Sequence, residues 1–294
     1  MAENIIIYKK IVEELEKRNP VALATIVNKE GSGPRDPGSS LVYTVDGVKI
    51  GTIGGGHIEK IIIEEAKKAL QEGKPRKIKL ALRRENIPPD AIKTNQLCGG
   101  IVEVFINVIN PPPRLIITGG GNVGKPIADI ANILGYKIII IDTNPKLANK
   151  ERFPYAEKVL AGNIVEKLES IKYSPFDIVV IAYGEVETDY QSLKTLVKNK
   201  FPGHIWALCS RTRATWMLKR LVEEENIELD NIVDKLHMPA GLDIGSDTPA
   251  EIAISILSEI ICVLKKCNIP VKSMNIARIW WETYKKDKSK TKHE

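Results

Sequence analysis

The strongest chemical signal in the sequence is a set of three glycines in the spacing Gly-x-Gly-x-x-Gly, at Gly119, Gly121 and Gly124. They follow a short apolar run, and Asp142 ends the next apolar run. In a strand–loop–helix unit such glycines permit a tight turn, the approach of a pyrophosphate and close helix–strand packing. The N–H groups at the helix start also favour anions. The pattern predicts a loop that binds a nucleotide or dinucleotide. Asp142 would bind a ribose hydroxyl and repel a 2′-phosphate, which favours NAD over NADP.

The same loop has other interpretations. Asn122 and Val123 belong to the predicted cofactor-binding segment, but such a loop can also be structural or take another nucleotide. An NAD-dependent oxidoreductase would need a proton-transfer residue. His204 opens a predicted strand and His237 precedes a loop, so we expect both to be structural or solvated. Arg211 and Arg213, just past the carboxyl end of a predicted strand, could meet an anionic ligand or face solvent.

Three loops in the first half carry residues that packing alone would not require. The first offers backbone donors and a guanidinium to an anion, and the second is a glycine run between a strand and a helix, suited to a phosphate or a pterin. The third places a thiol beside two glycines, where it can be exposed and reactive, although a buried, inert cysteine is the alternative. The predicted contact residues are Arg35 in the first loop, Gly54, Gly55, Gly56 and His57 in the second, and Cys98, Gly99 and Gly100 in the third.

The bulk composition limits the class of protein. The 294 residues are 43% hydrophobic, which is enough for two domains with cores, and the net charge is +6. Part of this excess lies in the basic tail 285–292, which we expect to be a solvated, frayed end, so nucleic acid is not an expected partner. No apolar run is long enough for a membrane span, and the first residues do not resemble a signal peptide. We therefore expect a cytoplasmic protein.

The cysteines give no sign of a metal site. No close CxxC pair occurs in the sequence. Cys262 and Cys267 lie in a predicted helix at positions i and i+5, which would put them on different faces and argues against joint metal binding. Disulfides are not expected in a reducing compartment.

Apolar periodicity predicts two different halves. The first half combines helices with mostly antiparallel strands. Its expected elements are helix 3–18, strands 21–27, 40–45 and 48–53, helix 58–71, and strands 78–82 and 101–108. In the second half strands alternate with helices, which is typical of a parallel sheet covered by helices. Its expected elements are strands 115–118, 137–141, 159–160, 178–182 and 205–209, helices 123–134, 189–198 and 213–224, and a helix that begins after Thr248 and ends near Cys267.

The predicted fold class is therefore α/β, with an N-terminal mixed α+β domain followed by a Rossmann-like parallel-sheet domain. Thr248 is the expected N-cap of the last helix, with Pro249 at its first position and Glu251 completing a capping box. The predicted boundaries are 1–110 for the first domain, 111–113 for a proline hinge, 114–275 for the Rossmann-like domain and 276–294 for a C-terminal segment with the basic tail.

Six short motifs occur in order along the chain: Gly31-Ser-Gly-Pro-Arg35, Gly51-Thr-Ile-Gly-Gly-Gly-His-Ile-Glu59, Cys98-Gly-Gly100, Gly119-Gly-Gly-Asn-Val-Gly124, Glu151-Arg-Phe-Pro154 and Pro239-Ala-Gly-Leu-Asp-Ile-Gly-Ser-Asp-Thr-Pro-Ala-Glu-Ile-Ala253. Together they resemble the XdhC/CoxI family, which are accessory proteins for xanthine dehydrogenase and related molybdenum hydroxylases. The resemblance spans nearly the whole chain except the basic tail. The last motif is the most specific, because it is not a general signal of the fold.

The resemblance implies a protein that binds molybdenum cofactor (molybdopterin), protects it and delivers it to an apo-molybdenum hydroxylase of the xanthine dehydrogenase, aldehyde oxidase or CO dehydrogenase type. In the family this accompanies sulfuration of the metal with help from a cysteine desulfurase. Cys98 matches the family's Cys-Gly-Gly position, and a thiolate there suits a molybdenum contact or sulfur transfer. Asp243, in the last motif, is a predicted cofactor contact. We expect a homodimer, and a maturation factor more than a turnover enzyme.

The chain departs from the family pattern at two places. Relatives often carry a Gly-His-x-x-Asp string after the fourth strand, whereas here only the glycine and the acidic end, Gly184 and Asp189, remain. Some relatives have a second cysteine where this chain has His57, so a two-cysteine mechanism at that loop is not expected. An NAD-dependent oxidoreductase and a nucleotide-sensing assembly module are the two alternative functions.

Overall fold

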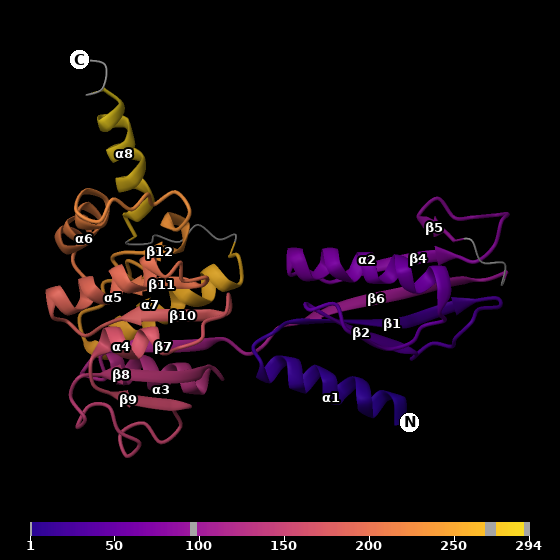
Figure 1. Ribbon diagram of the computed structural model, residues 1–294, viewed down its shortest axis with the longest axis horizontal. Helices are drawn as coiled ribbons and strands as arrows, with labels where there is room; N and C mark the ends of the chain where they lie inside the picture. The colour runs from indigo at the N-terminus through magenta and orange to yellow at the C-terminus, as the bar shows by residue number, and fades with distance from the viewer. Residues whose placement is uncertain (1, 95–98, 268–274, 291–294) are drawn as a thin grey trace. The chain divides into compact units, whose positions relative to one another are not determined.

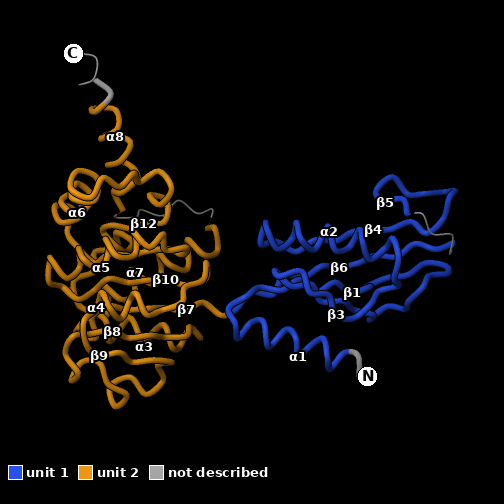
Figure 2. Tube along the Cα trace, in the orientation of Figure 1, with its two compact units in different colours: residues 1–111 blue, residues 112–294 orange. Residues whose placement is uncertain are grey.

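The computed structural model describes residues 2–94, 99–267 and 275–290, and the chain forms two compact units (Figure 2). Unit 1 comprises Met1–Pro111 and unit 2 comprises Pro112–Glu294. The three prolines at 111–113 lie between the last strand of unit 1 and the first strand of unit 2. Proline has no N–H group, so it cannot donate a hydrogen bond to a neighbouring strand. The predicted fold class is confirmed, with a mixed α+β unit followed by a Rossmann-like unit.

Unit 1 is built on a six-stranded sheet in the order β3-β2-β1-β6-β4-β5 (Figure 1). All its strand pairs are antiparallel except β4 with β5. Strand β5 was not predicted, because three residues are too short for a recognisable period. The elements are α1 (Ala2–Glu16), β1 (Val21–Glu30), β2 (Ser40–Thr44), β3 (Lys49–Gly51), α2 (Gly56–Glu72), β4 (Arg76–Ala81), β5 (Ala91–Lys93) and β6 (Ile101–Ile109).

The two helices of unit 1 belong to separate apolar clusters. Helix α2 buries Ile58 and Ile62, one helical turn apart, among side chains of β1, β2, β4 and β6. Helix α1 buries Ile7 and Ile11 in a smaller cluster with Val42 of β2. Successive residues of a strand point to opposite faces, so this sheet is apolar on both sides.

Unit 2 contains an all-parallel sheet in the order β12-β11-β10-β7-β8-β9. The chain starts in the middle at β7, adds β8 and β9 on one side, and then crosses over to β10 on the other side. Ligands of such sheets bind at this reversal, beyond the carboxyl ends of the strands. The elements are β7 (Arg114–Thr118), α3 (Gly124–Ile133), β8 (Lys137–Asp142), β9 (Lys158–Ala161), α4 (Ile164–Glu169), β10 (Asp177–Ile181), α5 (Val186–Lys198), β11 (His204–Ala207), α6 (Arg211–Glu223), η1 (Val233–Lys235), β12 (Leu236–His237), α7 (Pro249–Leu264) and α8 (Ala277–Lys290).

Helices cover both faces of the unit 2 sheet. Leu115 and Ile117 of β7 pack with apolar residues of α3 and α7, whereas Ile116 packs with α5 and α6 on the other face. Every residue of β7 and β10 is buried, which explains why the residues between their ends are continuous apolar runs in the sequence. Arg114 and Asp177, the charged first residues of the two strands, pair with each other at 2.6 Å. The short elements α4 and β12 were not predicted, because they are too short for a clear period.

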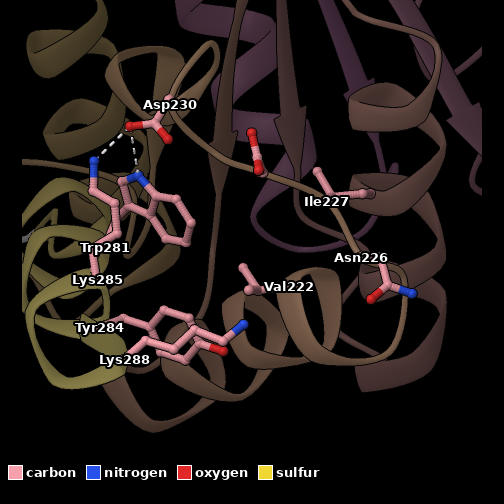
Figure 3. A pocket seen from close by; sticks show the side chains of 9 residues that line it. Val222, Asn226, Ile227, Asp230, Trp281, Tyr284, Lys285 and Lys288 are labelled. Carbon is pink, nitrogen blue, oxygen red and sulfur yellow. Dashed lines mark hydrogen bonds and ion pairs between the residues drawn. The ribbon is translucent and has the colours of Figure 1, made fainter. Parts of the chain in front are cut away.

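The expectation of a frayed basic tail is wrong as far as residue 290, because Ala277–Lys290 forms helix α8. Ala277 and Trp281 are buried in the core of unit 2. The Trp281 indole donates to Asp230 at 3.1 Å, and Lys285 pairs with the same carboxylate at 2.6 Å (Figure 3). The helix was not predicted because the segment is highly charged and only a few of its residues are apolar and buried.

Helix α7 confirms one prediction at its start and contradicts another at its end. Thr248 and Glu251 form the predicted capping box, with proline at the first helical position. The helix ends at Leu264, so Cys267 lies beyond it. The residues after the helix turn back towards its last turn, and the Cys262 thiol is hydrogen-bonded to Cys267. The prediction that these thiols lie on different faces is wrong, because it assumed that the helix continues to Cys267.

Candidate functional site

The loop between β7 and α3 uses its three glycines in two different ways. A Cβ on Gly124 would lie 1.8 Å from the carbonyl oxygen of Gly119, and a Cβ on Gly119 would lie 2.5 Å from that of Ala182. Gly119 also has a φ of +103°. At Gly121 a Cβ would meet no atom within 4 Å. The fold itself therefore requires the first and third glycines, while the second leaves an open face, as its predicted phosphate contact would need.

Side chains from two other segments hold this glycine loop. Asp142 is 2% exposed, and its carboxylate accepts hydrogen bonds from the N–H groups of Gly120 at 2.7 Å and Asn144 at 2.8 Å. Arg152, in the Glu151–Pro154 motif, donates from Nε to the carbonyl oxygen of Gly120 at 3.1 Å. A ribose hydroxyl bound to Asp142 would share oxygens that already accept backbone hydrogen bonds. The predicted ribose contact stays a prediction.

A cleft of about 610 Å³ opens at the carboxyl ends of β7, β8 and β10. Helix α3 begins beside it, and its N-cap Val123 provides no side-chain hydrogen bond to the helix. Arg213 lines the cleft and donates to the carbonyl oxygen of Gly184 at 3.4 Å. A helix N-terminus and a guanidinium both favour an anion. The lining residues are Gly121, Asp142, Asn144, Leu147, Tyr183, Gly184, Glu185, Val186 and Arg213.

A buried carboxyl supports the Gly184 loop of this cleft. Asp189 is 1% exposed, and its Oδ2 accepts a hydrogen bond from the Gly184 N–H at 3.1 Å. Its Oδ1 has no hydrogen-bond partner in the described part of the chain. Burial raises the pKa of Asp189 to about 6, although backbone hydrogen bonds from Gly184 and Tyr183 oppose the shift. The two residues that remain of the family's Gly-His-x-x-Asp string are thus bonded to each other.

The two histidines of unit 2 considered for proton transfer lie together at one edge of the sheet. His204 Nδ1 is 3.1 Å from His237 Nε2, and the His237 ring stacks on Trp206 with centroids 4.1 Å apart. Burial lowers the pKa of His237 to about 3 and also lowers that of His204. Neither ring is among the residues that line the cleft. Their contacts are those of a packed structural pair.

The loop that carries Asp243 is anchored by a buried carboxylate of α7. Glu259 Oε2 accepts hydrogen bonds from the Gly241 N–H at 2.7 Å and from the Trp206 indole at 2.9 Å. This explains why a glutamate lies in an otherwise apolar helix face. Asp243 itself is exposed and is not among the residues that line the unit 2 cleft. Its predicted cofactor contact stays a prediction.

The structure brings together the three glycine-rich loops of unit 1. A Cβ on Gly54 would lie 2.4 Å from Cγ of Pro34, so the second loop packs on the first. A Cβ on Gly100 would lie 2.1 Å from the carbonyl oxygen of Ser32, and one on Gly31 would lie 3.3 Å from the Cα of Gly100, so the third loop also packs on the first. The approaches at Gly54 and Gly100 are too close for a side chain unless the neighbouring loop shifts. The sequence identified the three loops but not their contacts with one another.

Several predicted contact residues of these loops present open surfaces. Arg35 and His57 are exposed, as is Gly56. A Cβ on Gly55 or Gly99 would meet no atom within 4 Å, so the backbone is accessible there. Cys98 lies outside the described residues, and its role stays a prediction.

Glu59 shapes the second loop, and the sequence reasoning left it out of the predicted site. The side chain is 5% exposed, and its carboxylate accepts hydrogen bonds from the N–H groups of Gly55 at 3.0 Å and Ile53 at 3.2 Å. It also accepts from the Thr52 hydroxyl and pairs with Lys49 at 2.5 Å. Burial alone would raise the pKa of Glu59, but these partners outweigh it and lower the pKa to about 2. An acidic residue in the first turn after a glycine run was the available signal.

A second feature missed by the sequence reasoning is a pair of arginines beside the third loop. Arg83 and Arg84 line a hollow of about 360 Å³ together with Gly99. Arg83 donates from Nη2 to the carbonyl oxygen of Asn86 at 2.6 Å, while its buried Nε has no partner in the described residues. Glu85 lines the hollow as well, so it combines two guanidinium groups, which suit an anion, with one carboxylate and accessible backbone.

Two kinds of feature do not occur among the described residues. None of their helices is long and apolar enough to cross a membrane. Their histidine, cysteine and acidic side chains form no group of three placed to hold a metal ion.

Each unit of the chain matches a known protein family. The XdhC and CoxI family matches residues 14–83, and the XdhC Rossmann domain matches residues 115–260. The two matches together cover most of the chain.

The chain is also similar to individual proteins. The chain is 38% identical over 259 residues to "Uncharacterized protein YqeB" of Escherichia coli (strain K12), which covers 87% of this chain and 46% of that protein. It is 29% identical over 163 residues to a protein of Bacillus subtilis (strain 168) named as a probable xanthine dehydrogenase subunit, covering 55% of this chain and 46% of that protein. The chain thus spans less than half the length of these relatives. A solved structure described as a xanthine dehydrogenase from Bacillus halodurans has 22% identity and a TM-score of 0.48, covering 88% of this chain and 96% of that one.

Proposed function

The chain belongs to the XdhC and CoxI family, and from this premise we propose that it binds molybdenum cofactor and delivers it, with sulfuration of the metal, to a molybdenum hydroxylase of the xanthine dehydrogenase class. The observation that carries the proposal is the packing of three glycine-rich loops of unit 1 against one another. The cofactor is cargo here, so its site must release it as well as bind it.

The described residues of this site fit a pterin that carries a phosphate. Accessible backbone at Gly55 and Gly99 allows a flat ring to approach closely, since no side chain stands in the way. Arg35 and the Arg83–Arg84 pair supply positive charge for the phosphate. Cys98 directly precedes Gly99 and would supply the soft thiolate that molybdenum or a transferred sulfur requires. A cysteine desulfurase would be the sulfur source, and a homodimer would be the working form.

The test is to purify the protein in the presence of molybdenum cofactor, and to measure both bound molybdopterin and activation of an apo-hydroxylase. Wild type should hold the pterin and activate the enzyme, and Cys98→Ala should lose about tenfold or more of both. Cys209→Ala, which removes a half-buried thiol from unit 2, is the matched control and should behave as wild type. If wild type and Cys98→Ala both come out empty and neither activates the enzyme, the proposal is wrong.

A second candidate function is nucleotide binding in the unit 2 cleft. It is favoured by the open face of Gly121 beside the start of α3 and by Arg213. Titration with NADH, followed by its fluorescence, tests this, and Gly121→Val should weaken binding because it fills the open face. Binding with turnover of a small substrate would indicate an NAD-dependent oxidoreductase. Binding without turnover or cofactor delivery would indicate a nucleotide-sensing module.

A further inference from the structure

The thiols of Cys262 and Cys267 meet at the end of α7, and we propose that they form a redox-active dithiol that closes to a disulfide by exchange with a low-molecular-weight disulfide. Neither cysteine lies in the six family motifs or lines the unit 2 cleft. The inference is therefore independent of the proposed cofactor delivery.

The backbone brings the two residues together. Lys266 has a φ of +51°, in the left-handed region that reverses the chain after a helix. The Cys267 N–H donates to the Cys262 carbonyl oxygen at 2.9 Å, and the Lys266 N–H donates to that of Val263 at 3.1 Å. This pair of bonds defines a Schellman motif, in which the residue after the left-handed one contacts the residue five positions before it. Here both positions of that contact are cysteines, so the motif itself juxtaposes two thiols.

The two thiols differ in a way that gives them different roles. Both are reduced, with Cys267 exposed and Cys262 half-buried. The hydrogen bond to Cys267 is the main cause that raises the pKa of Cys262, and burial raises it further. Cys262 therefore stays protonated while its thiol faces the Cys267 sulfur. Cys267 is the accessible partner that attacks first, and Cys262 is the resolving thiol beside it.

The reaction has two exchange steps. The Cys267 thiolate attacks one sulfur of a disulfide R–S–S–R, forms a mixed disulfide and releases one thiolate. Cys262 then loses its proton and attacks the Cys267 sulfur, which forms the Cys262–Cys267 bond and releases the second thiolate. Two electrons pass from the protein to the small disulfide, and the two thiol protons end on the two R–SH products. In a reducing compartment such a bond is transient rather than structural.

The cysteine pair lies close to the buried carboxylate that anchors the Asp243 loop. Cys262 lies one turn after Glu259, the residue that holds Trp206 and Gly241. Closing the disulfide would fix the last turn of this helix to the chain that leaves it.

The test treats the full-length protein with excess glutathione disulfide and maps its cysteine peptides by mass spectrometry. In wild type the peptide that joins Cys262 and Cys267 should lose two hydrogen atoms and carry no lasting glutathione, and dithiothreitol should restore it. In Cys262→Ser, glutathione should stay on Cys267. In Cys267→Ser, modification of Cys262 should be slower by about tenfold or more than that of Cys267 in Cys262→Ser. Cys209→Ser is the matched control and should react as wild type.

A lasting glutathione adduct on Cys267 in wild type, or no reaction at either residue, would overturn the inference. A second measurement uses only the wild-type protein and so does not depend on the folding of any variant. Phenylarsine oxide bridges two adjacent thiols, so wild type should bind it at Cys262 and Cys267 in a form that glutathione does not displace and dithiothreitol does. Arsenical found only at other cysteines would overturn the inference as well.

Discussion

Each unit holds a glycine-rich loop with a buried carboxylate, and the two arrangements differ in what surrounds the carboxylate. In unit 2 Asp142, at the end of a strand, accepts the backbone N–H groups of Gly120 and Asn144. In unit 1 Glu59, in the first turn of a helix, accepts the backbone N–H groups of Ile53 and Gly55 and also pairs with Lys49. A carboxylate is suited to both places because one group accepts several backbone donors at once.

The glycines of the two loops are required for different reasons. Gly124 is needed because its own strand–loop–helix unit brings it against Gly119, five residues earlier in the sequence. Gly54 and Gly100 are needed because loops distant in sequence pack together, on Pro34 and on Ser32. The unit 2 loop is therefore a local structure, whereas the unit 1 site exists only when the whole unit is folded. Substitutions that affect only the local contacts of the unit 2 loop, or only the long-range contacts of the unit 1 loops, test this difference.

The largest expected effect is that of Gly124→Val. The new Cβ would overlap the Gly119 carbonyl oxygen, so unit 2 should lose about 3 kcal/mol or more of its free energy of unfolding. Denaturation followed by tryptophan fluorescence measures this selectively, because all four tryptophans lie in unit 2. Gly121→Val is the matched control and should leave the transition unchanged, because a Cβ there meets no atom within 4 Å. Equal destabilisation by both variants would contradict the local account.

Glu59→Gln should destabilise unit 1 by about 2 kcal/mol, because the ion pair with Lys49 is lost and a buried amide replaces a carboxylate. Far-UV circular dichroism and hydrogen exchange of unit 1 peptides measure the effect. Lys60→Ala, which removes an exposed charge from the same helix, is the control.

The same variant tests the pH dependence of unit 1. The pKa of Glu59 is lowered from 4.5 to about 2, so its stabilising contribution is present above pH 4.5 and is lost as the pH falls towards 2. The wild-type protein should lose about 1–3 kcal/mol over this window through Glu59, and Glu59→Gln should lose less. Parallel pH profiles for the two proteins would show that Glu59 is not the titrating group.

Asp142→Asn should have a smaller effect, about 1 kcal/mol, because the amide can still accept one of the two backbone hydrogen bonds. Hydrogen exchange at Gly120 and Asn144 should quicken, while unit 1 peptides stay unchanged. A loss as large as that of Glu59→Gln would show that the two carboxylates are equivalent despite their different surroundings.

The smallest expected effect is that of Arg152→Ala, about 0.5–1 kcal/mol in the tryptophan-monitored transition, because one partly exposed hydrogen bond to Gly120 is lost. Lys150→Ala is not a suitable control, since Lys150 bonds the carbonyl oxygen of Ala156, so Glu151→Ala on the exposed side is used. No change in Arg152→Ala would mean that Asp142 alone holds the loop.

Much of unit 2 could be predicted from the sequence because its signals are local. The inner residues of the buried parallel strands are continuous apolar runs, the glycine spacing marks the strand–loop–helix turn, and Thr248 with Glu251 marks the start of α7. Helix α8 was missed because its buried residues, Ala277 and Trp281, are few among many charges.

The sequence by itself determined the fold class, the family resemblance and the identity of the glycine-rich loops. Only the tertiary structure decided that three loops of unit 1 meet, that Glu59 rather than a predicted site residue shapes one of them, and that Arg83 lies beside Gly99. It likewise placed Cys267 against Cys262. The physical reason is that periodicity and spacing describe neighbours along the chain, whereas these contacts depend on where a helix stops and on which distant loops pack together.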